Sequence, residues 1–238
     1  MRIIRQFGIV LSELDPSRIP ANTRALVLDW DDTVVATREA KVRQHIFVAK
    51  EQYGIDLTFE EMAVDWGRPL HELIQKWYRV EGGSQAYQDV LRTVFSHSKD
   101  FPKQLFDGVH DVVDAARNAG LPVGIVTGSP SDDLVHDFEN TGFTKASFDY
   151  FQASEDTEFH KPDPRVFDPL MKWLGARAIA PADVLYIGDS LPDYQAARGA
   201  GFMFLGVETG VVDAQKFHDA GILSIGAISQ LLKRMQNS

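Results

Sequence analysis

Asp29 and Asp31 stand two residues apart at the end of an apolar, β-prone run, ALVLDWDDTVV at residues 25–35. One carboxylate can act as a nucleophile while another carboxyl group gives or takes up a proton, so the pair can divide the work of a group-transfer reaction. Because the chain turns after the strand, the two side chains can address different atoms of one substrate. A buried strand that ends in acids indicates a functional edge of a sheet.

Asp189 and Asp193 stand four residues apart across an expected strand-to-helix junction, after the apolar run of VLYIGDS at 184–190. Carboxylate and carbonyl oxygens are the ligands that Mg²⁺ prefers in proteins. These two acids could therefore hold Mg²⁺, directly or through water, together with Asp29 and the backbone carbonyl of Asp31. Such an acid cluster needs a cation if it is to act on an anion, because like charges repel.

Two other segments can bind an anion beside these acids. Thr127 follows the apolar run of VGIVTGSP at 123–130, so its hydroxyl and the next backbone N–H groups can contact anionic oxygens, while Gly128 allows close backbone approach. Lys161, in HKPDP at 160–164, is the strong positive side chain among these motifs. It can pair with the Asp29 carboxylate and with a bound anion.

The elements that must position these residues alternate between strands and helices. Apolar runs at 25–35, 123–130, 184–190 and 201–207 predict buried strands, and helices are expected at 107–120 and 193–201. This alternation predicts a doubly wound parallel α/β sheet with helices on both faces. Ligands of such sheets bind beyond the carboxyl ends of the strands, which is where the acids stand.

The interval 38–98 has no convincing buried strand and several helical patterns, which predicts a small all-α insertion. Thr58 and Glu61 make a capping box. The aromatic residues whose spacing favours the core of this bundle are Trp66, Trp77, Tyr78, Tyr87 and Phe95. The predicted domains are an α/β core at 1–36 and 100–238 and a helical cap at 37–99. Residues 1–24 carry no motif, and an added strand or helix on the core is expected there.

Taken together and in this order, DWDDT at 29–33, Thr127, Lys161 in HKPDP and GDSLPD at 188–193 resemble the four motifs of the haloacid dehalogenase superfamily. The resemblance covers residues 25 to about 207. It implies a Rossmann-like core with Mg²⁺ as cofactor. It also implies a helical cap between the first and second motifs, as in enzymes similar to phosphoglycolate phosphatase and β-phosphoglucomutase.

The same resemblance implies a role for each motif residue. Asp29 would form an aspartyl-phosphate, and Asp31 would act as general acid and then activate water. Thr127, Gly128 and Lys161 would bind the phosphoryl group. The presence of Asp31 favours hydrolysis of a phosphate ester. The dehalogenase branch has a motif similar to DxY at this place, and the phosphonate-cleaving branch has one similar to DWxGT, without the second acid.

Two residues outside these roles call for separate interpretation. Arg68 in WGRPL resembles a cap-loop residue that reaches the active site in related enzymes, so it is the candidate for substrate contact from the cap. A surface arginine beside a helix start is the alternative. Asp32 stands at a position where many members of the family that the motifs resemble have glycine. We expect its side chain to cap local backbone, without a catalytic role.

The bulk composition limits the partners. The 238 residues are 44% hydrophobic and 24% charged, as in globular proteins, and the net charge of −10 argues against nucleic acid as a partner. We expect no signal peptide and no membrane span, and the absence of cysteine excludes thiolate chemistry. The expected enzyme is cytoplasmic and acts on a small phosphorylated metabolite. The sequence does not determine its oligomeric state.

Two alternatives stay open for the sequence alone. A phosphomutase of the β-phosphoglucomutase kind would share the cap class and would return the phosphoryl group from Asp29 to another hydroxyl. A binding protein without turnover could retain the fold and the metal site, although no motif residue is missing. The sequence does not identify the metabolite.

Overall fold

Parallel strands form the sheet of the computed structural model, which describes residues 19–66 and 68–236. They are β1 (Ala25–Leu28), β2 (Val123–Val126), β3 (Tyr150–Gln152), β4 (Val184–Gly188), β5 (Met203–Val207) and β6 (Ser224–Ile225). Their spatial order is β3-β2-β1-β4-β5-β6. Leu28 pairs with Ile125 on one side and Ile187 on the other, so β1, β2 and β4 end at the same edge.

The predicted strands correspond to β1, β2, β4 and β5, and every residue of these four strands is buried. Their continuous apolar runs follow from helices on both faces, which leave no side for polar residues. β3 and β6 have no counterpart in the sequence prediction. They are three and two residues long, which is too short for a periodic pattern.

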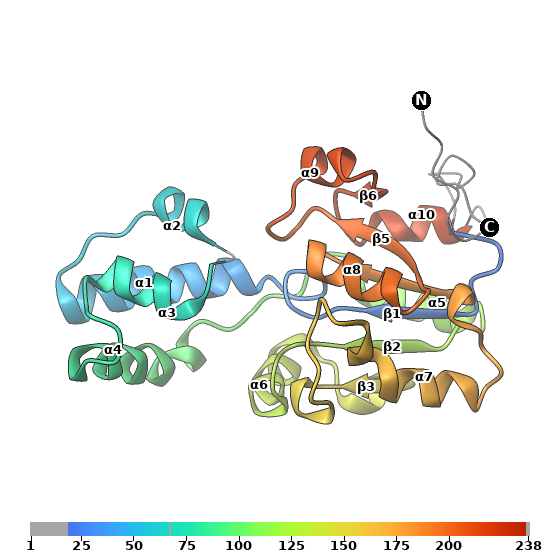
Figure 1. The fold of residues 1–238 in the computed structure, drawn as a ribbon, viewed down its shortest axis with the longest axis horizontal. Helices are drawn as coiled ribbons and strands as arrows, with labels where there is room; N and C mark the ends of the chain where they lie inside the picture. Colours follow the sequence, from blue (N-terminus) through green and yellow to red (C-terminus); the bar gives the residue numbers. More distant parts are fainter. Residues whose placement is uncertain (1–18, 67, 237–238) are drawn as a thin grey trace. The chain divides into compact units, whose positions relative to one another are not determined.

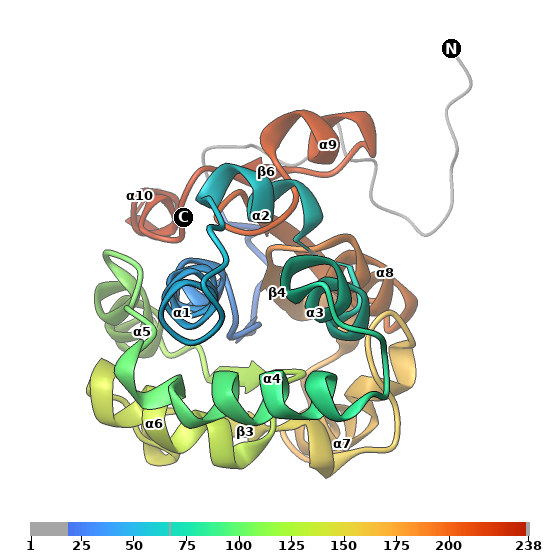
Figure 2. The same ribbon diagram turned by 90° about the vertical axis from the view of Figure 1, so that its left-hand side faces the viewer.

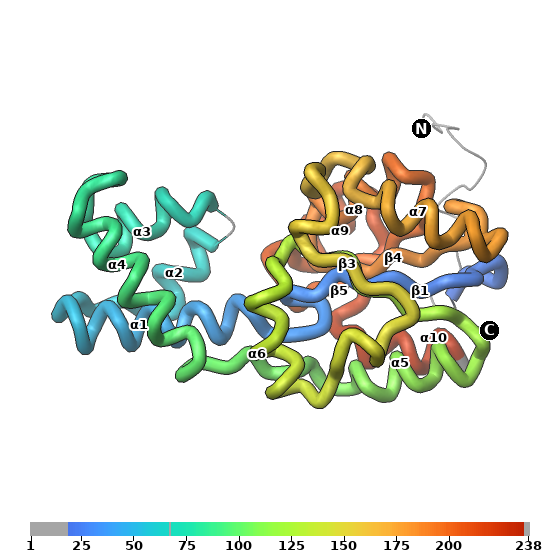
Figure 3. The backbone as a smooth tube through the Cα atoms, turned by 90° about the horizontal axis from the view of Figure 1, so that it is seen from below, coloured from blue at the N-terminus to red at the C-terminus, as the bar shows by residue number. Residues whose placement is uncertain are grey.

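Helices cover the two faces of the sheet (Figure 1). They are α5 (Val109–Asn118), α7 (Asp168–Gly175), α8 (Leu191–Gly199), α9 (Ala214–Asp219) and α10 (Gln230–Gln236). Figure 3 shows α7 and α8 on one face and α5 and α10 on the other, in agreement with the contacts of α8 with β4 and β5 and of α5 with β2 and α10. The predicted doubly wound α/β fold is thereby confirmed.

Four further helices follow β1 in the chain. They are α1 (Thr37–Tyr53), α2 (Phe59–Asp65), α3 (Leu70–Tyr78) and α4 (Gln85–Ser96), and they gather into one bundle (Figure 2). The capping box at the start of α2 is present, with Glu61 N–H donating to Thr58 Oγ1 over 3.2 Å. Trp77 and Tyr78 are buried as expected, but Phe95 is 59% exposed because it faces away from the apolar stripe of α4. Trp66 and Tyr87 are partly buried.

The chain divides into two compact units. Of the described residues, unit 1 comprises those within Met1–Val34, Phe106–Ser131 and Phe143–Ser238, and unit 2 comprises those within Val35–Leu105 and Asp132–Gly142. Unit 2 thus takes in most of α6 (Ser131–Thr141) as well as the predicted insertion. The domain boundaries at 36/37 and 99/100 stay a prediction, and the expectation of an extra element within residues 1–18 lies outside the described residues.

Among the described helices, none combines the length and the apolar character that crossing a membrane requires.

Candidate active site

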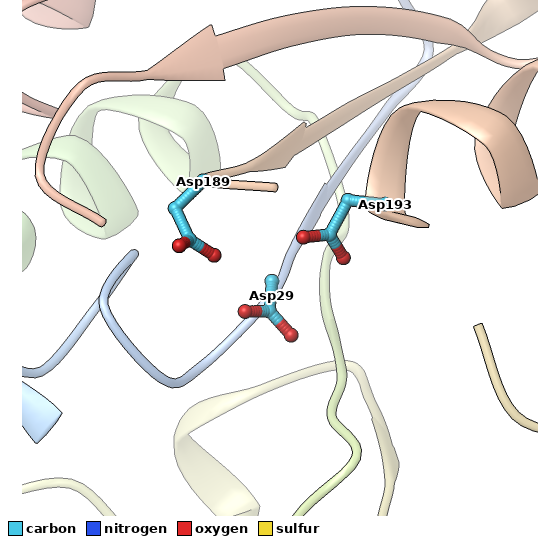
Figure 4. A group of neighbouring side chains, drawn as sticks. All are labelled: Asp29, Asp189 and Asp193. Carbon is cyan, nitrogen blue, oxygen red and sulfur yellow. The ribbon is translucent and has the colours of Figure 1, made fainter. Parts of the chain in front are cut away.

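Three buried aspartates meet at the carboxyl edge of the sheet in unit 1. Asp29 follows β1, Asp189 follows β4, and Asp193 lies in the first turn of α8. Each offers one carboxylate oxygen within 4.8 Å of the others, and the three side chains lie close together (Figure 4). Asp29 and Asp189 are 7% exposed and Asp193 is 2% exposed. The parallel register of β1 and β4 brings these residues together, as predicted from the strand ends.

The charge of this cluster is only partly balanced by the protein. Burial, opposed by Lys161 and reinforced by Asp193 and Asp31, raises the pKa of Asp29 above its usual range. Burial and the neighbouring charge of Asp29 likewise raise the pKa of Asp189. Buried carboxylates whose ionised forms are disfavoured in this way are typical of ligand-binding sites.

Lys161 supplies the positive side chain of the cluster. Its Nζ donates to Asp29 Oδ1 at 2.5 Å and to Val126 O at 3.2 Å, and it lies 2.7 Å from Asp193 Oδ1. Although burial lowers the pKa of Lys161, the charges of Asp193 and Asp29 raise it well above the usual range, so the ammonium stays charged. The sequence prediction that Lys161 pairs with Asp29 agrees with this geometry.

Asp31 lies at the same edge and contacts the segment after β2. Its Oδ2 accepts from Ser129 Oγ at 2.5 Å, and Thr127 Oγ1 lies 3.5 Å away. Thr127 Oγ1 itself accepts from Ser129 N–H at 3.0 Å. A Cβ added at Gly128 would meet no atom within 4 Å, so this part of the edge has space for a ligand. Ser129 is a site residue that sequence reasoning did not single out.

Ser190 fixes Asp193 through the N-terminal cap of α8. Asp193 N–H donates to Ser190 Oγ at 3.2 Å, Ser190 N–H donates to Asp193 Oδ2 at 3.2 Å, and the Ser190 hydroxyl donates to the same oxygen. This reciprocal pattern is a capping box with an aspartate in place of the usual glutamate. The S-x-x-D spacing in GDSLPD is the signal that could have predicted it.

The loop after β5 forms a further wall of the site. Thr209 Oγ1 donates to the Asp32 carbonyl at 2.5 Å. At Gly210, an added Cβ would lie 1.7 Å from Asp189 Oδ2, so only glycine leaves the carboxylate in place. No motif in the sequence marked this loop, because the approach depends on the tertiary fold.

Asp32 and Arg68 were the two residues with uncertain roles. Asp32 is buried with φ +54°, a region that aspartate tolerates better than most residues, and its charge contributes to the raised pKa of Asp189. Arg68 belongs to unit 2, between α2 and α3, where its guanidinium lies 3.7 Å from Asp65 and 3.6 Å from Glu72. Contact of Arg68 with substrate stays a prediction.

The donor set of the three aspartates fits Mg²⁺. All three offer hard carboxylate oxygens in a buried cluster with one lysine. The raised pKa values of Asp29 and Asp189 indicate that further positive charge is favourable there. Asp29, Asp189 and Asp193 are the residues that would hold the ion, with the Asp31 carbonyl as the predicted additional ligand.

Comparison with known proteins defines the class. The family model described as "Haloacid dehalogenase-like hydrolase" matches residues 26–207, and the chain therefore belongs to this family. The chain is 26% identical over 199 residues to a Clostridium perfringens protein named pyrophosphatase PpaX, covering 83% of this chain and 89% of the relative. It is 35% identical over 106 residues to the phosphoglycolate phosphatase of Escherichia coli K12, covering 44% of this chain and 40% of that enzyme.

The fold has counterparts among solved structures. The crystal structure of a Thermotoga maritima protein described as a β-phosphoglucomutase aligns with a TM-score of 0.76 at 18% identity, over 90% of this chain and 99% of that one. The predicted family, the α/β fold and an enzyme of the phosphatase class of hydrolases are thereby confirmed.

Proposed function

We propose that this protein hydrolyses a small phosphorylated metabolite through a covalent phosphoryl intermediate on Asp29, with Mg²⁺ as cofactor. The observation that carries the proposal is the contact of Lys161 Nζ with Asp29 Oδ1, at 2.5 Å, inside a buried cluster of acids. A buried nucleophilic carboxylate, a fixed ammonium and further carboxylates for a cation are the parts that phosphoryl transfer to an enzyme requires.

In the first half of the reaction, an Asp29 carboxylate oxygen attacks phosphorus and the bond to the leaving oxygen breaks. The proton of the Asp31 carboxyl group goes to that oxygen, so the alcohol leaves neutral. Lys161 faces both Asp29 and the place of the transferred group, and its charge offsets the charge that develops there. The product of this half is a mixed anhydride of Asp29 with phosphate.

In the second half, Asp31 is ionised and takes a proton from water, whose oxygen attacks phosphorus. The bond to Asp29 breaks, inorganic phosphate leaves, and both acids return to their starting states. Ser129 Oγ donates to Asp31 Oδ2 at 2.5 Å and so helps to orient this carboxyl group for proton transfer. Mg²⁺, held by Asp29, Asp189 and Asp193, would supply the positive charge that lets a carboxylate approach a phosphate ester.

The experiment that tests this function is a panel of phosphorylated metabolites assayed for release of inorganic phosphate. We expect turnover of at least one compound with Mg²⁺ and its loss in EDTA, with recovery when Mg²⁺ is restored in excess. Turnover that persists in EDTA would contradict the metal-dependent mechanism. Isomerisation of a hexose phosphate without phosphate release would indicate a mutase, and no reaction across the panel would indicate a binding protein.

A further inference from the structure

Tyr186 lies in the middle of β4 and is fully buried, yet its hydroxyl reaches the active site. Tyr186 Oη donates toward Asp193 Oδ1 at 3.2 Å and toward Val126 O at 3.3 Å. Burial raises the pKa of Tyr186 well above its usual range. The proposed reaction uses no proton from it.

The acceptors of Tyr186 are the same two atoms that Lys161 contacts. Lys161 Nζ lies 2.7 Å from Asp193 Oδ1 and 3.2 Å from Val126 O, and 5.3 Å from the centre of the Tyr186 ring. The hydroxyl and the ammonium therefore share one carboxylate oxygen and one carbonyl, while the ring packs beside the ammonium. A cation at this distance from an aromatic ring is attracted to it.

We propose that Tyr186 is a positioning residue for Lys161: its hydroxyl and ring hold the ammonium at the point from which it faces Asp29 and the transferred phosphoryl group. A lysine side chain has four flexible carbon–carbon torsions, so its ammonium needs fixed neighbours. Displacement by about 1 Å of a group that acts in the transition state can lower the rate by up to about 100-fold. The inference rests on the proposed function.

The test removes only the hydroxyl, in Tyr186→Phe, and compares the variant with Tyr194→Phe. Tyr194 lies in α8 and packs against Phe204 in the same core cluster. Its substitution is the control, because it also removes one tyrosine hydroxyl. We expect Tyr186→Phe to lower kcat about tenfold with little change in KM. Orthovanadate, which resembles the transition state, should inhibit about tenfold less well, while inhibition by inorganic phosphate changes by less than about twofold.

Equal losses for vanadate and phosphate, or an unchanged kcat with a lowered Tm, would show that Tyr186 is an ordinary core residue. Tyr194→Phe should leave all of these values unchanged. If Tyr194→Phe lowered kcat as much as Tyr186→Phe, the effect would come from loss of any local hydroxyl and the inference would be wrong.

A second measurement does not depend on turnover. In ¹H–¹⁵N spectra of lysine side chains, the wild-type Lys161 ammonium should give a slowly exchanging signal with a ring-current shift, assigned by its loss in Lys161→Arg. Tyr186→Phe should broaden or move this signal. Absence of a protected wild-type signal would overturn the positioning role, whereas an inactive wild-type protein with the expected signal would overturn the proposed function alone.

Discussion

The two units of the molecule differ in how the charges of their buried side chains are balanced. In unit 1, Lys161 pairs with Asp29 and Asp193 of the three buried aspartates. Burial together with mutual repulsion holds the pKa values of Asp29 and Asp189 above their usual range. In unit 2, the buried side chains of His45 and Asp137 each have a partner within the unit. His45 lies 3.0 Å from Tyr78 Oη, and Asp137 accepts from Lys103 at 2.9 Å.

Asp65 in unit 2 follows the same rule, since Lys76 Nζ and Trp77 Nε1 donate to it at 2.7 and 3.3 Å. The comparison teaches that a cluster of acids short of positive charge points to a ligand, whereas acids with their own cations point to structure. Each substitution below tests one side of this difference.

The largest expected effect is on activity, from Asp29→Asn in unit 1. The amide cannot attack phosphorus, so kcat should fall by at least about 10³-fold. Stability in Mg²⁺-free buffer at pH 7 should not fall. The pKa of Asp29 is raised in the folded chain, so above the pKa of a free aspartate its ionised form lowers the free energy of unfolding. Steady-state kinetics and thermal unfolding of the same preparation measure both. A parallel drop in Tm would mean that Asp29 serves the fold.

Asp137→Asn in unit 2 should show the converse. Loss of this charge leaves the largely buried Lys103 ammonium without its carboxylate, which costs about 3 to 5 kcal/mol of unfolding free energy for a buried pair. Urea unfolding measures the loss. The kcat of the molecules that remain folded should change little, and a loss of kcat comparable to that of Asp29→Asn would erase the distinction between the units.

His45 should make the stability of unit 2 depend on pH. Burial lowers its pKa to about 4 from an ordinary 6.5, so the unfolded chain binds the proton more readily between these values. Stability is therefore complete above pH 6.5 and falls by roughly 1.4 kcal/mol per pH unit as the pH drops toward 4. Urea midpoints at pH 7.5 and pH 5 should differ more for the wild type than for His45→Gln. An equal pH dependence of the wild type and His45→Gln would show that His45 is not the cause.

The smallest effect concerns the glycine beside the acids. A Cβ in Gly210→Ala would lie 1.7 Å from Asp189 Oδ2 and must displace this carboxylate. Mg²⁺ binding, followed by calorimetry, should weaken about tenfold. Gly175→Ala is the control, because its Cβ would meet no atom within 4 Å in α7. If both variants bound Mg²⁺ like the wild type, Asp189 would not be a ligand.

Asp29, Thr127 and Asp189 could be predicted from the sequence because each directly follows a continuous apolar run. The register of β1 with β2 and β4 then brings them to one edge, which needs no knowledge of side-chain packing. The short strands β3 and β6 were not predicted, because they form by pairing with neighbouring strands and have no periodic pattern of their own. Gly210 and Tyr186 escaped for a related reason, since their contacts with Asp189 and Asp193 exist only in the folded chain.

The exposed position of Phe95 shows the same limit in unit 2. Helical spacing predicts which face a residue shares but not how far the packed face extends around the helix. Phe95 lies beyond that face of α4, while Val90 and Val94 lie within it.

The central claim is that Asp29 takes the phosphoryl group. The most direct measurement is mass spectrometry of peptides from enzyme quenched in acid during turnover of an active phosphorylated substrate. We predict a phosphoryl adduct on the peptide that contains Asp29 in the wild type and no adduct on this peptide in Asp29→Asn. Turnover with no adduct on this peptide, or an adduct that persists in Asp29→Asn, would contradict the account.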